Sequence, residues 1–500
     1  MDYDVIVIGS GLGGLTAASR LAVLGHSVGV FEEHFIPGGY ATNFKRKNYN
    51  FDVSLHGIGG LEEGGNIHNI LSACNVIDKI TPLKNSEAYS VMWNETLTIV
   101  PNNKQEYKKL LINKFPVEEK GIHNLFTAID RFEDGFSRFI LKRDSSILNK
   151  LHKNVLLFIQ WSAKTTYEVI IKYVKDEEFI RFFTTLWTYY GLPPAELSAL
   201  YFFIPWVSYH SHGKYYIKGG SQSLSNSFVD VIENNGGKVH LKSPVENILY
   251  ENNKVTGIKL KNGDEFNCNW VISNANPIST YKMLPKESLT KKEEDKILNS
   301  QIGCTLSQLY IGLDCNPSKL GIPNDEVFFF AGDSHEEDYK LAINNQYDKC
   351  GFLLTNYNSM DESLNYYDNG VLTMTYIDNY NYWSSNKEDY KKQKIEVKES
   401  MISRLENYYP GISDHIVVCE LGTPKTMERY SKNPLGAVYG YGQYVNQAGR
   451  YRLTKKTSIK NLSFVGAWTN PGGGYEGSIS GGIVEAHRVH RNINKAHENK

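Results

Sequence analysis

The chain of 500 residues is longer than one hydrophobic core usually serves, so we expect two or more lobes. Its 54 Lys and Arg residues balance 55 Asp and Glu residues to a formal net charge of −1, which leaves no basic field for nucleic acid. The six cysteines lie far apart, without C-x-x-C or paired-histidine spacing. The sequence therefore predicts neither a metal site nor disulfides, and it favours a reduced, cytoplasmic setting.

The chain opens with a dinucleotide-binding pattern. Residues 4–8 (DVIVI) predict a buried strand, and residues 15–24 (LTAASRLAVL) predict a helix. Between them lies G-x-G-x-x-G, whose glycines allow a tight turn and let a pyrophosphate approach the helix N-terminus. The predicted cofactor contacts of this turn are Gly9, Gly11, Leu12, Gly13 and Gly14.

A second parallel strand is predicted over residues 26–33 (HSVGVFEE). Glu32, with Glu33 beside it, ends this strand, where a carboxylate accepts hydrogen bonds from both ribose hydroxyls of an adenosine. An acid there disfavours a 2′-phosphate, so the sequence predicts a bound adenine dinucleotide. Because the first strand begins within a few residues of Met1, no room is left for a signal peptide, and we expect the protein to stay inside the cell.

The segment 34–60 carries a family resemblance. Its Pro37-Gly38-Gly39 break permits close approach of the backbone, and the residues after it are expected to line the same dinucleotide. The patterns E-x-x-x-x-P-G-G and F-D-V-x-x-H resemble a family of flavoproteins that includes phytoene desaturases, carotene cis-trans isomerases and retinol saturases. The resemblance implies FAD rather than NAD, with contacts from Gly38, Gly39, Tyr40, Ala41 and Thr42.

His56 ends the second of these patterns. Its imidazole either faces the flavin and donates a proton, or hydrogen-bonds to backbone in a glycine-rich turn. We treat it as a candidate catalytic residue with both roles open.

Residues 117–210 predict a helical insertion, because three segments carry apolar residues at helical spacing: 124–141, 149–174 and 177–192. We expect this insertion to face the substrate or a membrane. The aromatic run 185–210 is either ordinary helix core or a tunnel for a long apolar substrate. Its YYGLPP segment resembles retinol saturases, which favours the tunnel. The longest apolar runs are too short to cross a bilayer, so any membrane contact would be peripheral.

Residues 211–278 predict a glycine turn, a helix ending at Glu233 and four strands, with Asn262-Gly263 as a hairpin turn. In the related flavoproteins the strand that begins here at Val245 faces the adenine, and Asn274 is among the implied cofactor contacts.

The remaining middle of the chain predicts a second sheet. Paired strands are expected over 89–100, and further strands over 304–313, 326–332, 352–358 and 371–377, followed by a long amphipathic helix over 391–409. By resemblance this sheet walls a substrate cavity above the flavin.

The C-terminal segment repeats the geometry of the first motif, with a strand (462–467), a turn of three glycines and a helix expected from near Ser478. By resemblance it holds the ribityl side and pyrimidine end of FAD through Gly466, Ala467, Gly473, Gly474, Gly477 and Ser478. Tyr475 and Glu476 lie in a loop expected to border the isoalloxazine. Glu476 is the preferred proton donor or acceptor, against the alternative of an N-capping glutamate, and Tyr475 is a further catalytic candidate.

The sequence thus predicts an α/β fold with a Rossmann-type FAD-binding domain, a mixed-sheet substrate domain and a helical insertion. The FAD-binding parts are 1–66, 211–278 and 445–500, the substrate-domain parts are 67–116 and 279–444, and the insertion is 117–210. The expected activity is FAD-dependent desaturation, saturation or cis-trans isomerisation of an apolar polyene, isoprenoid or acyl chain such as a carotenoid or retinoid, with an external electron donor or acceptor.

Two alternatives use the same fold. An amine oxidase is disfavoured by the sequence Gly466-Ala467-Trp468, where amine oxidases normally carry an acid. A non-enzymatic prenyl- or lipid-binding protein is disfavoured by the complete glycine set and by Glu32.

Overall fold

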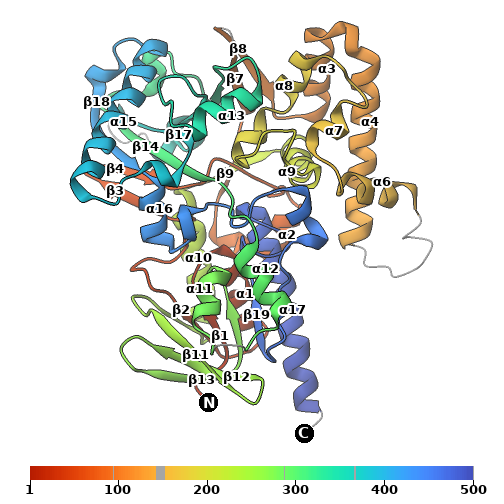
Figure 1. Ribbon diagram of the computed structural model, residues 1–500, viewed down its shortest axis with the longest axis vertical. Coiled ribbons are helices and arrows are strands. Elements are labelled where there is room, and N and C mark those ends of the chain that lie inside the picture. Colours follow the sequence, from red (N-terminus) through yellow and green to blue (C-terminus); the bar gives the residue numbers. More distant parts are fainter. Residues whose placement is uncertain (94, 142–151, 286–287, 365–367, 499–500) are drawn as a thin grey trace.

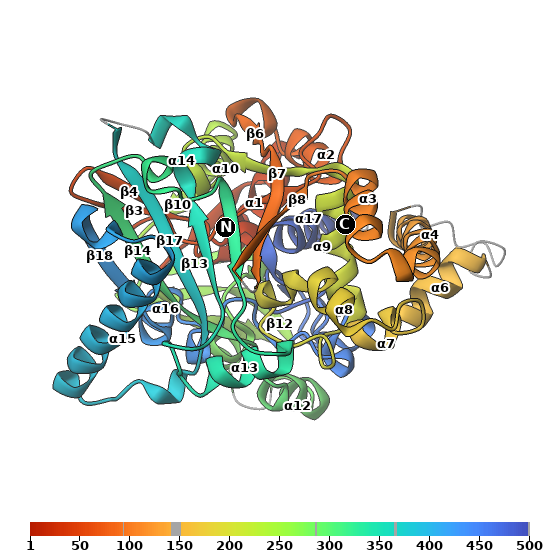
Figure 2. The same cartoon turned by 90° about the horizontal axis from the view of Figure 1, so that it is seen from above.

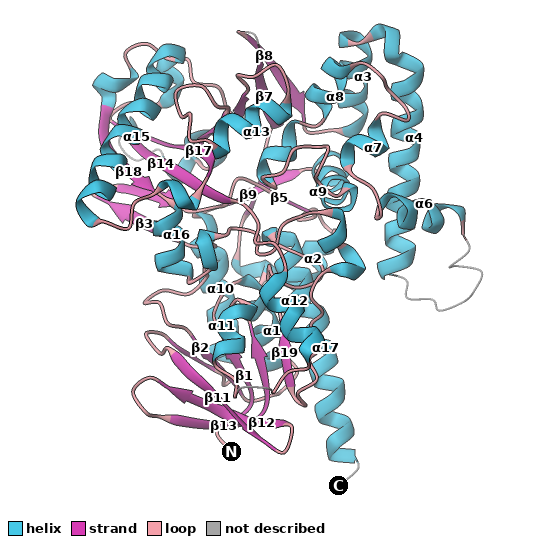
Figure 3. Ribbon diagram, viewed as in Figure 1, coloured by secondary structure: helices cyan, strands magenta, loops and turns pink. Residues whose placement is uncertain are grey.

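Three bodies of secondary structure meet in the computed structural model, which describes residues 1–93, 95–141, 152–285, 288–364 and 368–498. Both termini lie at the foot of the molecule beside a first sheet, while a second sheet and a group of helices lie above it (Figure 1). Figure 3 shows the third body to be helical, whereas the first two are built around strands.

The first sheet joins three distant segments of the chain. Its order is β10-β2-β1-β13-β12-β11, and β19 pairs with β13. The fully buried Val5 on β1 pairs in parallel with Val28 on β2 and with Trp270 on β13. This is the predicted Rossmann-type sheet, and the expected hairpin joins β12 to β13. The strands are β1 (Tyr3–Ile8), β2 (Val28–Phe31), β10 (Lys238–His240), β11 (Val245–Glu251), β12 (Lys254–Leu260), β13 (Glu265–Ser273) and β19 (Leu462–Phe464).

Helix α1 (Leu12–Val23) is the centre of the helical layer on this sheet. It is rich in alanine and leucine, is buried along most of its length, and packs against α10 (Gly220–Asn234) and α17 (Gly474–Glu498). A shorter helix, α2 (Asn66–Ala73), also contacts α17. The two ends of the chain are therefore packed together at the glycine-rich turn.

The second sheet has the order β18-β14-β17-β16-β15-β7-β8. Its neighbouring strands are antiparallel except for the parallel pair β15 and β7, so the sheet is mixed, as predicted. Its strands are β7 (Glu87–Trp93), β8 (Thr96–Pro101), β14 (Thr305–Leu313), β15 (Asp325–Phe329), β16 (Phe352–Asn356), β17 (Gly370–Asp378) and β18 (Ile416–Gly422).

Shorter elements connect these layers. Two small sheets pair β3 with β4 and order β5-β9-β6. Their strands are β3 (Asn43–Arg46), β4 (Tyr49–Asp52), β5 (Ile58–Gly59), β6 (Pro82–Lys84) and β9 (Lys214–Ile217). The helices of this part of the chain are α11 (Pro277–Lys282), α12 (Lys291–Asn299), α13 (His335–Ile343), α14 (Tyr357–Met360), α15 (Lys387–Tyr408) and α16 (Pro424–Ser431).

The helical body begins earlier than residue 117. Its helices are α3 (Lys104–Lys114), α4 (Glu119–Phe136), α6 (Lys153–Trp161), α7 (Thr166–Ile170), α8 (Glu177–Phe183), the 3-10 helix η4 (Thr185–Tyr189) and α9 (Ala199–His212). Residues 149–151, where the second predicted helix begins, lie outside the described residues. From Lys153 onward that segment forms two helices, because Thr165 caps α7 in a reciprocal capping box with Glu168.

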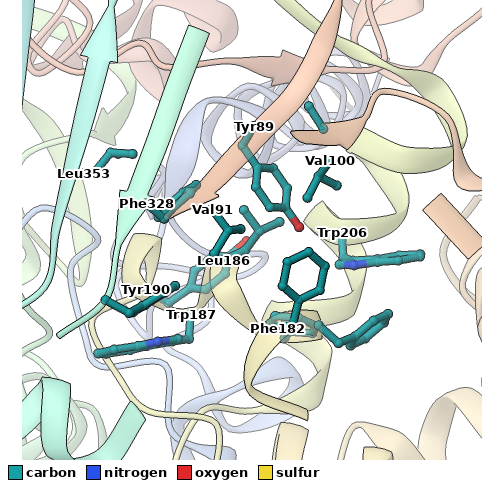
Figure 4. Close-up of a cluster of buried hydrophobic side chains, with 14 of the residues drawn as sticks. Tyr89, Val91, Val100, Phe182, Leu186, Trp187, Tyr190, Trp206, Phe328 and Leu353 are labelled. Carbon is teal, nitrogen blue, oxygen red and sulfur yellow. The ribbon is translucent and has the colours of Figure 1, made fainter. Parts of the chain in front are cut away.

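A dense aromatic core joins the helical body to the second sheet. Figure 2 shows β7 and β8 at the edge of the sheet nearest to the helices, and Figure 4 shows Tyr89 and Val100 of these strands facing Trp206 of α9. Tyr89, Val100 and Trp206 are fully buried. Among the described helices, none combines the length and the apolar composition that a membrane span requires.

Candidate cofactor and substrate site

A single cavity of about 2190 Å³ brings the predicted site residues together. All of them line it except Gly14, whose backbone N–H instead donates a 3.0 Å hydrogen bond to Oδ1 of Asn274. The cavity is at least twice the volume of most small-molecule pockets, which are about 300–1,000 Å³. It therefore has room for a long cofactor together with a substrate.

The glycine turn brings the two ends of the chain into backbone contact. A Cβ placed on Gly13 would lie 2.8 Å from both Cα and N of Gly466, so the packing of the two segments leaves no room for a side chain at position 13. Asn274, at the end of β13, packs under the same turn and is closest to Gly11, Gly13 and Gly14. Asn274 thus holds the turn in place as well as lining the cavity.

Glu32 is fixed at the cavity wall. Its Oε2 accepts hydrogen bonds of 2.7 Å from both N–H and Oγ–H of Ser10, and its Oε1 accepts a 2.8 Å bond from N–H of His34. Nε2 of His34 is buried in the cavity wall, and no described residue hydrogen-bonds to it. The exposed Glu33 lies beside the cavity, 3.7 Å from Nζ of Lys432.

The expected start of the last helix near Ser478 is wrong, because α17 begins at Gly474. The run GGGYEGS has low helix propensity, and packing on α1 overrides it. Tyr475 and Glu476 therefore lie in the first helical turn and not in a loop. Both still line the cavity.

Glu476 and Tyr475 differ in what they contact. Oε1 of Glu476 accepts a 2.8 Å hydrogen bond from N–H of Gly59, and burial raises the pKa of this carboxyl. The hydroxyl of Tyr475 lies 2.6 Å from Oγ of Ser221 and 2.9 Å from Oγ of Ser54. Glu476 is thus the one of the two with the more suitable acid–base character, whereas the Tyr475 hydroxyl is held in a hydrogen-bond network.

The described contacts of the His56 ring are to side chains and not to backbone. Nδ1 lies 3.1 Å from Oε1 of Glu326 and 3.0 Å from Oγ1 of Thr355. Glu326 is fully buried on β15 and also pairs with the fully buried Lys214 of β9. Sequence reasoning missed Glu326 and Lys214. The available signal was a charged residue within the apolar strand EVFFF.

Several tyrosines line another part of the cavity. Tyr189 donates a 2.7 Å hydrogen bond to Oε2 of Glu326, and Tyr209 donates a 3.0 Å bond to the carbonyl of Gly57. The rings of Tyr190 and Tyr439 face each other with centroids 6.3 Å apart. The run 185–210 thus contributes Tyr189, Tyr190 and Tyr209 to the cavity wall and Trp206 to the core.

A cluster of three possible metal ligands lies elsewhere in the fold, and the cysteine spacing did not predict it. Asp314, Cys315 and His415, at the adjoining ends of β14 and β18, bring their ligand atoms within 4.8 Å of one another. They lie outside the cavity wall, and Nδ1 of His415 already pairs with Oδ1 of Asp314 at 2.8 Å.

The first sheet is of the Rossmann type and is completed by both chain ends, a carboxylate ends its second strand, and one large cavity is shared with a mixed sheet. These features define a flavoprotein oxidoreductase. The model of the family "Flavin containing amine oxidoreductase" matches residues 12–490, and the chain belongs to this family. Its cofactor is FAD. The residues present fit FAD. Gly13 and Gly466 leave no side chain between the turn and the cavity, and Glu32 is held at the cavity wall by hydrogen bonds. Nε2 of His34 is buried in the same wall without a partner among the described residues.

The chain is similar in sequence to enzymes named for polyene substrates and similar in fold to an amine oxidase. The chain is 28% identical to prolycopene isomerase of Daucus carota, over 98% of this chain and 80% of that protein. It is 27% identical to all-trans-retinol 13,14-reductase of Danio rerio, over 93% of this chain and 82% of that protein. The fold is similar to that of putrescine oxidase, with a TM-score of 0.66 at 13% identity, over 98% of this chain and 99% of that one.

Proposed function

We propose that this protein is a FAD-dependent oxidoreductase that acts on C–C or C=C bonds of an apolar polyene such as a carotenoid or retinoid. The observation that carries the proposal is the continuity of the cavity. One wall holds the dinucleotide turn, and another is made of apolar side chains from the second sheet and the helical body, including Phe136, Ile204, Phe330, Phe352 and Leu353. The names of the relatives, an isomerase and a reductase of polyenes, support the same substrate class.

The glycine turn and Glu32 would hold the adenosine and pyrophosphate, and the segment from Gly473 to Ser478 would hold the flavin end. FAD supplies hydride transfer when it is bound. The chain's own contribution is to exclude water with the tyrosine and phenylalanine walls and to move a proton at Glu476 or His56. An external electron donor or acceptor would complete a net desaturation or saturation, and an isomerisation would need none.

The charges near the flavin end favour a neutral substrate over an amine. Burial raises the pKa of Glu476, which makes it a weaker counter-charge for an ammonium group than an exposed carboxylate. The carboxylate of Glu326 is already paired with Lys214 and lies beside His56. Neither acid is therefore well suited as the counter-charge of a substrate ammonium group.

Peripheral contact with a membrane would bring an apolar substrate to this cavity. Phe139 is 47% exposed and also borders the cavity, and its ring lies 5.4 Å from that of Phe158 on α6. Leu156 and Ile159 on α6 are 49% and 45% exposed, one helical turn apart. We call these three side chains the Phe139 patch. They would insert into the bilayer next to the cavity.

The test is the anaerobic visible spectrum of the purified protein with FAD, before and after a reductant and then a carotene or retinol are added. Re-oxidation of the flavin by the polyene supports saturation, and a shift in the polyene spectrum while the flavin stays reduced supports isomerisation. Bleaching of the oxidised flavin by a more saturated polyene supports desaturation. Reaction with amines alone, or a colourless protein that does not take up FAD, would overturn the proposal.

A further inference from the structure

A buried ionic cluster lies behind His56. Lys214 on β9 donates hydrogen bonds to Oε2 of Glu326 and, at 3.0 Å, to the carbonyl of Ala88. Tyr189 on η4 donates to the same carboxylate oxygen, and the other oxygen, Oε1, lies 3.1 Å from Nδ1 of His56. Lys214 and Glu326 are fully buried, while the side chain of His56 is 14% exposed and borders the cavity. His56 and Tyr189 are therefore the members of the cluster that a substrate can touch, and His56 is the one that carries an imidazole.

The charge of this cluster is fixed by its partners. Burial alone would raise the pKa of Glu326, but Lys214 and His56 outweigh burial and lower it to about 2, so the carboxylate stays charged. An ionised carboxylate accepts hydrogen bonds and donates none. Nδ1 of His56 lies 3.1 Å from Oε1 of this carboxylate and 3.0 Å from the hydroxyl of Thr355, which can accept from it or donate to it. Because a nitrogen lone pair facing the carboxylate would be repelled by it, the pair favours the tautomer with the proton on Nδ1.

The second ring nitrogen of His56, Nε2, faces no charged partner in the described part of the chain. No hydrogen bond from the described residues engages Nε2 of His56, and the ring is packed between Tyr189 and Tyr357, with centroids 6.2 and 6.3 Å away. The titratable groups that the structure places against the ring are thus Glu326, Tyr189 and Tyr357, and Lys214 lies behind Glu326. With the proton on Nδ1, only Nε2 is free to exchange a proton with a molecule in the cavity.

The position of His56 places that exchange near the flavin end of the cavity. Three residues after His56, N–H of Gly59 binds Glu476 in the first turn of α17. Between them, the carbonyl of Gly57 accepts from Tyr209. The segment 56–59 thus links the buried ionic cluster to the residues that would border the flavin.

We propose that Lys214 and Glu326 are positioning residues that hold His56 with Nδ1 protonated and Nε2 directed to the substrate, so that His56 moves the proton of the reaction. This inference rests on the proposed function and names its acid–base group. When a C=C bond is reduced, the Nε2–H bond breaks and a C–H bond forms at one carbon, while its neighbour receives the hydride that the reduced flavin supplies. In the oxidative direction Nε2 accepts the proton that leaves the substrate.

The first experiment reads the imidazole directly, by ¹⁵N NMR of histidine-labelled protein, with His56→Gln identifying the signal. The test variant is Lys214→Met/Glu326→Leu/Tyr189→Phe, which removes both charges and leaves no tyrosine hydroxyl without its acceptor. We expect the neutral wild-type ring to be the Nδ1–H tautomer, and the triple variant to lose this preference and the turnover. Tyr189→Phe alone is the matched control and should keep the Nδ1–H signal.

A folded triple variant that binds FAD and keeps both the Nδ1–H signal and the wild-type turnover would overturn the proposal. His56→Ala offers a second test that does not disturb the buried pair, with polyene turnover expected to fall about 10²–10⁴-fold and to recover on addition of imidazole. Unchanged turnover in His56→Ala would also overturn it. If the wild-type protein with FAD turns over no polyene, the proposed function fails, and the tautomer measurement alone decides the role of Lys214 and Glu326.

Discussion

The carboxylate of Glu476 accepts a 2.8 Å hydrogen bond from the backbone N–H of Gly59, which joins the first turn of α17 to the segment that follows His56. This bond joins residues 417 positions apart in the chain, and Glu476 lines the same cavity wall as His56, Gly57 and Gly60. The two candidate proton carriers belong to this wall and differ in environment. Glu476 is a partly buried acid with a raised pKa, and His56 is an imidazole beside a paired carboxylate.

The Glu476→Gln variant separates these two candidates. The amide oxygen of glutamine can still accept from Gly59, so we expect the fold and the yellow FAD spectrum to be kept. If Glu476 moves the proton, turnover should fall by about 10²–10⁴-fold, because glutamine cannot exchange it. If turnover in a steady-state assay is unchanged, Glu476 is a structural acceptor for Gly59 and has no part in proton transfer.

The cavity wall around the glycine turn could be predicted because its signals are local. The strand, the glycines, the helix and Glu32 follow one another within about 30 residues, and each glycine of the motif has either a positive φ or a close neighbour that a side chain would meet. The two sheets were also predictable from runs of β-branched and aromatic residues. The start of α17 was not, because its glycine-rich first turn is helical only through its packing on α1.

The ionic cluster behind His56 could not be predicted, because its members are brought together by tertiary structure alone. Lys214 and Glu326 are 112 residues apart, and the sequence of each strand gives no sign of the other. The Glu476 contact with Gly59 has the same origin. Sequence patterns thus located residues that line the cavity, whereas the partners that set acid–base character became visible only in the fold.

Removing one member of the buried pair should be costly. Lys214→Met leaves the carboxylate of Glu326 buried without its main partner, and we expect the free energy of unfolding to fall by about 3–5 kcal/mol. Lys214→Met/Glu326→Leu, which removes both charges, should recover most of that loss. Urea unfolding of the two variants checks this, and equal stability of the single variant and the wild type would mean that the pair is not buried as described.

The contact between α1 and α17 depends on Gly482. A Cβ on this residue would overlap the carbonyl oxygen of Gly13 and lie 2.8 Å from Cβ of Thr16, so Gly482→Ala should push α17 away from the glycine turn. We expect a loss of about 1–3 kcal/mol of stability and weaker FAD binding.

The matched control for that variant is its neighbour on the same helix. A Cβ on Gly481 meets nothing nearer than Cδ of Pro471 at 3.4 Å, so Gly481→Ala should leave FAD binding unchanged and stabilise the helix by roughly 0.5–1 kcal/mol. Thermal unfolding and FAD titration compare the two. Equal behaviour of both variants would contradict the close packing of α17 on the turn.

The contact between α4 and α9 should depend on pH through His212. Nε2 of His212 lies 3.3 Å from Oε1 of Glu133, and this hydrogen bond raises the pKa of His212 above 6.5. Burial alone would raise the pKa of Glu133, but His212 and Lys104 lower it below 4.5. The His212 contribution is present below pH 6.5 and is lost as the pH rises through its raised pKa. The Glu133 contribution is present above pH 4.5 and is lost as the pH falls through its lowered pKa.

The contact is therefore strongest between about pH 4.5 and 6.5. His212→Gln should lower the Tm of the protein at pH 5.5 and leave it nearly unchanged at pH 8.5. A Tm difference of the same size at both pH values would mean that the histidine acts through packing and not through its charge.

Binding of the protein to liposomes should depend on the Phe139 patch. Phe139, Leu156 and Ile159 present exposed apolar surface, and Phe139 also borders the cavity, so a bilayer that holds the substrate would meet the protein there. Replacing the three residues by serine should reduce the fraction of protein that floats with liposomes and slow turnover of a polyene delivered in them. Val117→Ser is the control. Val117 is 96% exposed, but it precedes the first turn of α4 and so lies at the other end of this helix from Phe139, which follows the last turn. Equal flotation of the triple variant and the wild type would place membrane contact elsewhere, and equal recovery of the wild type with and without liposomes would remove it altogether.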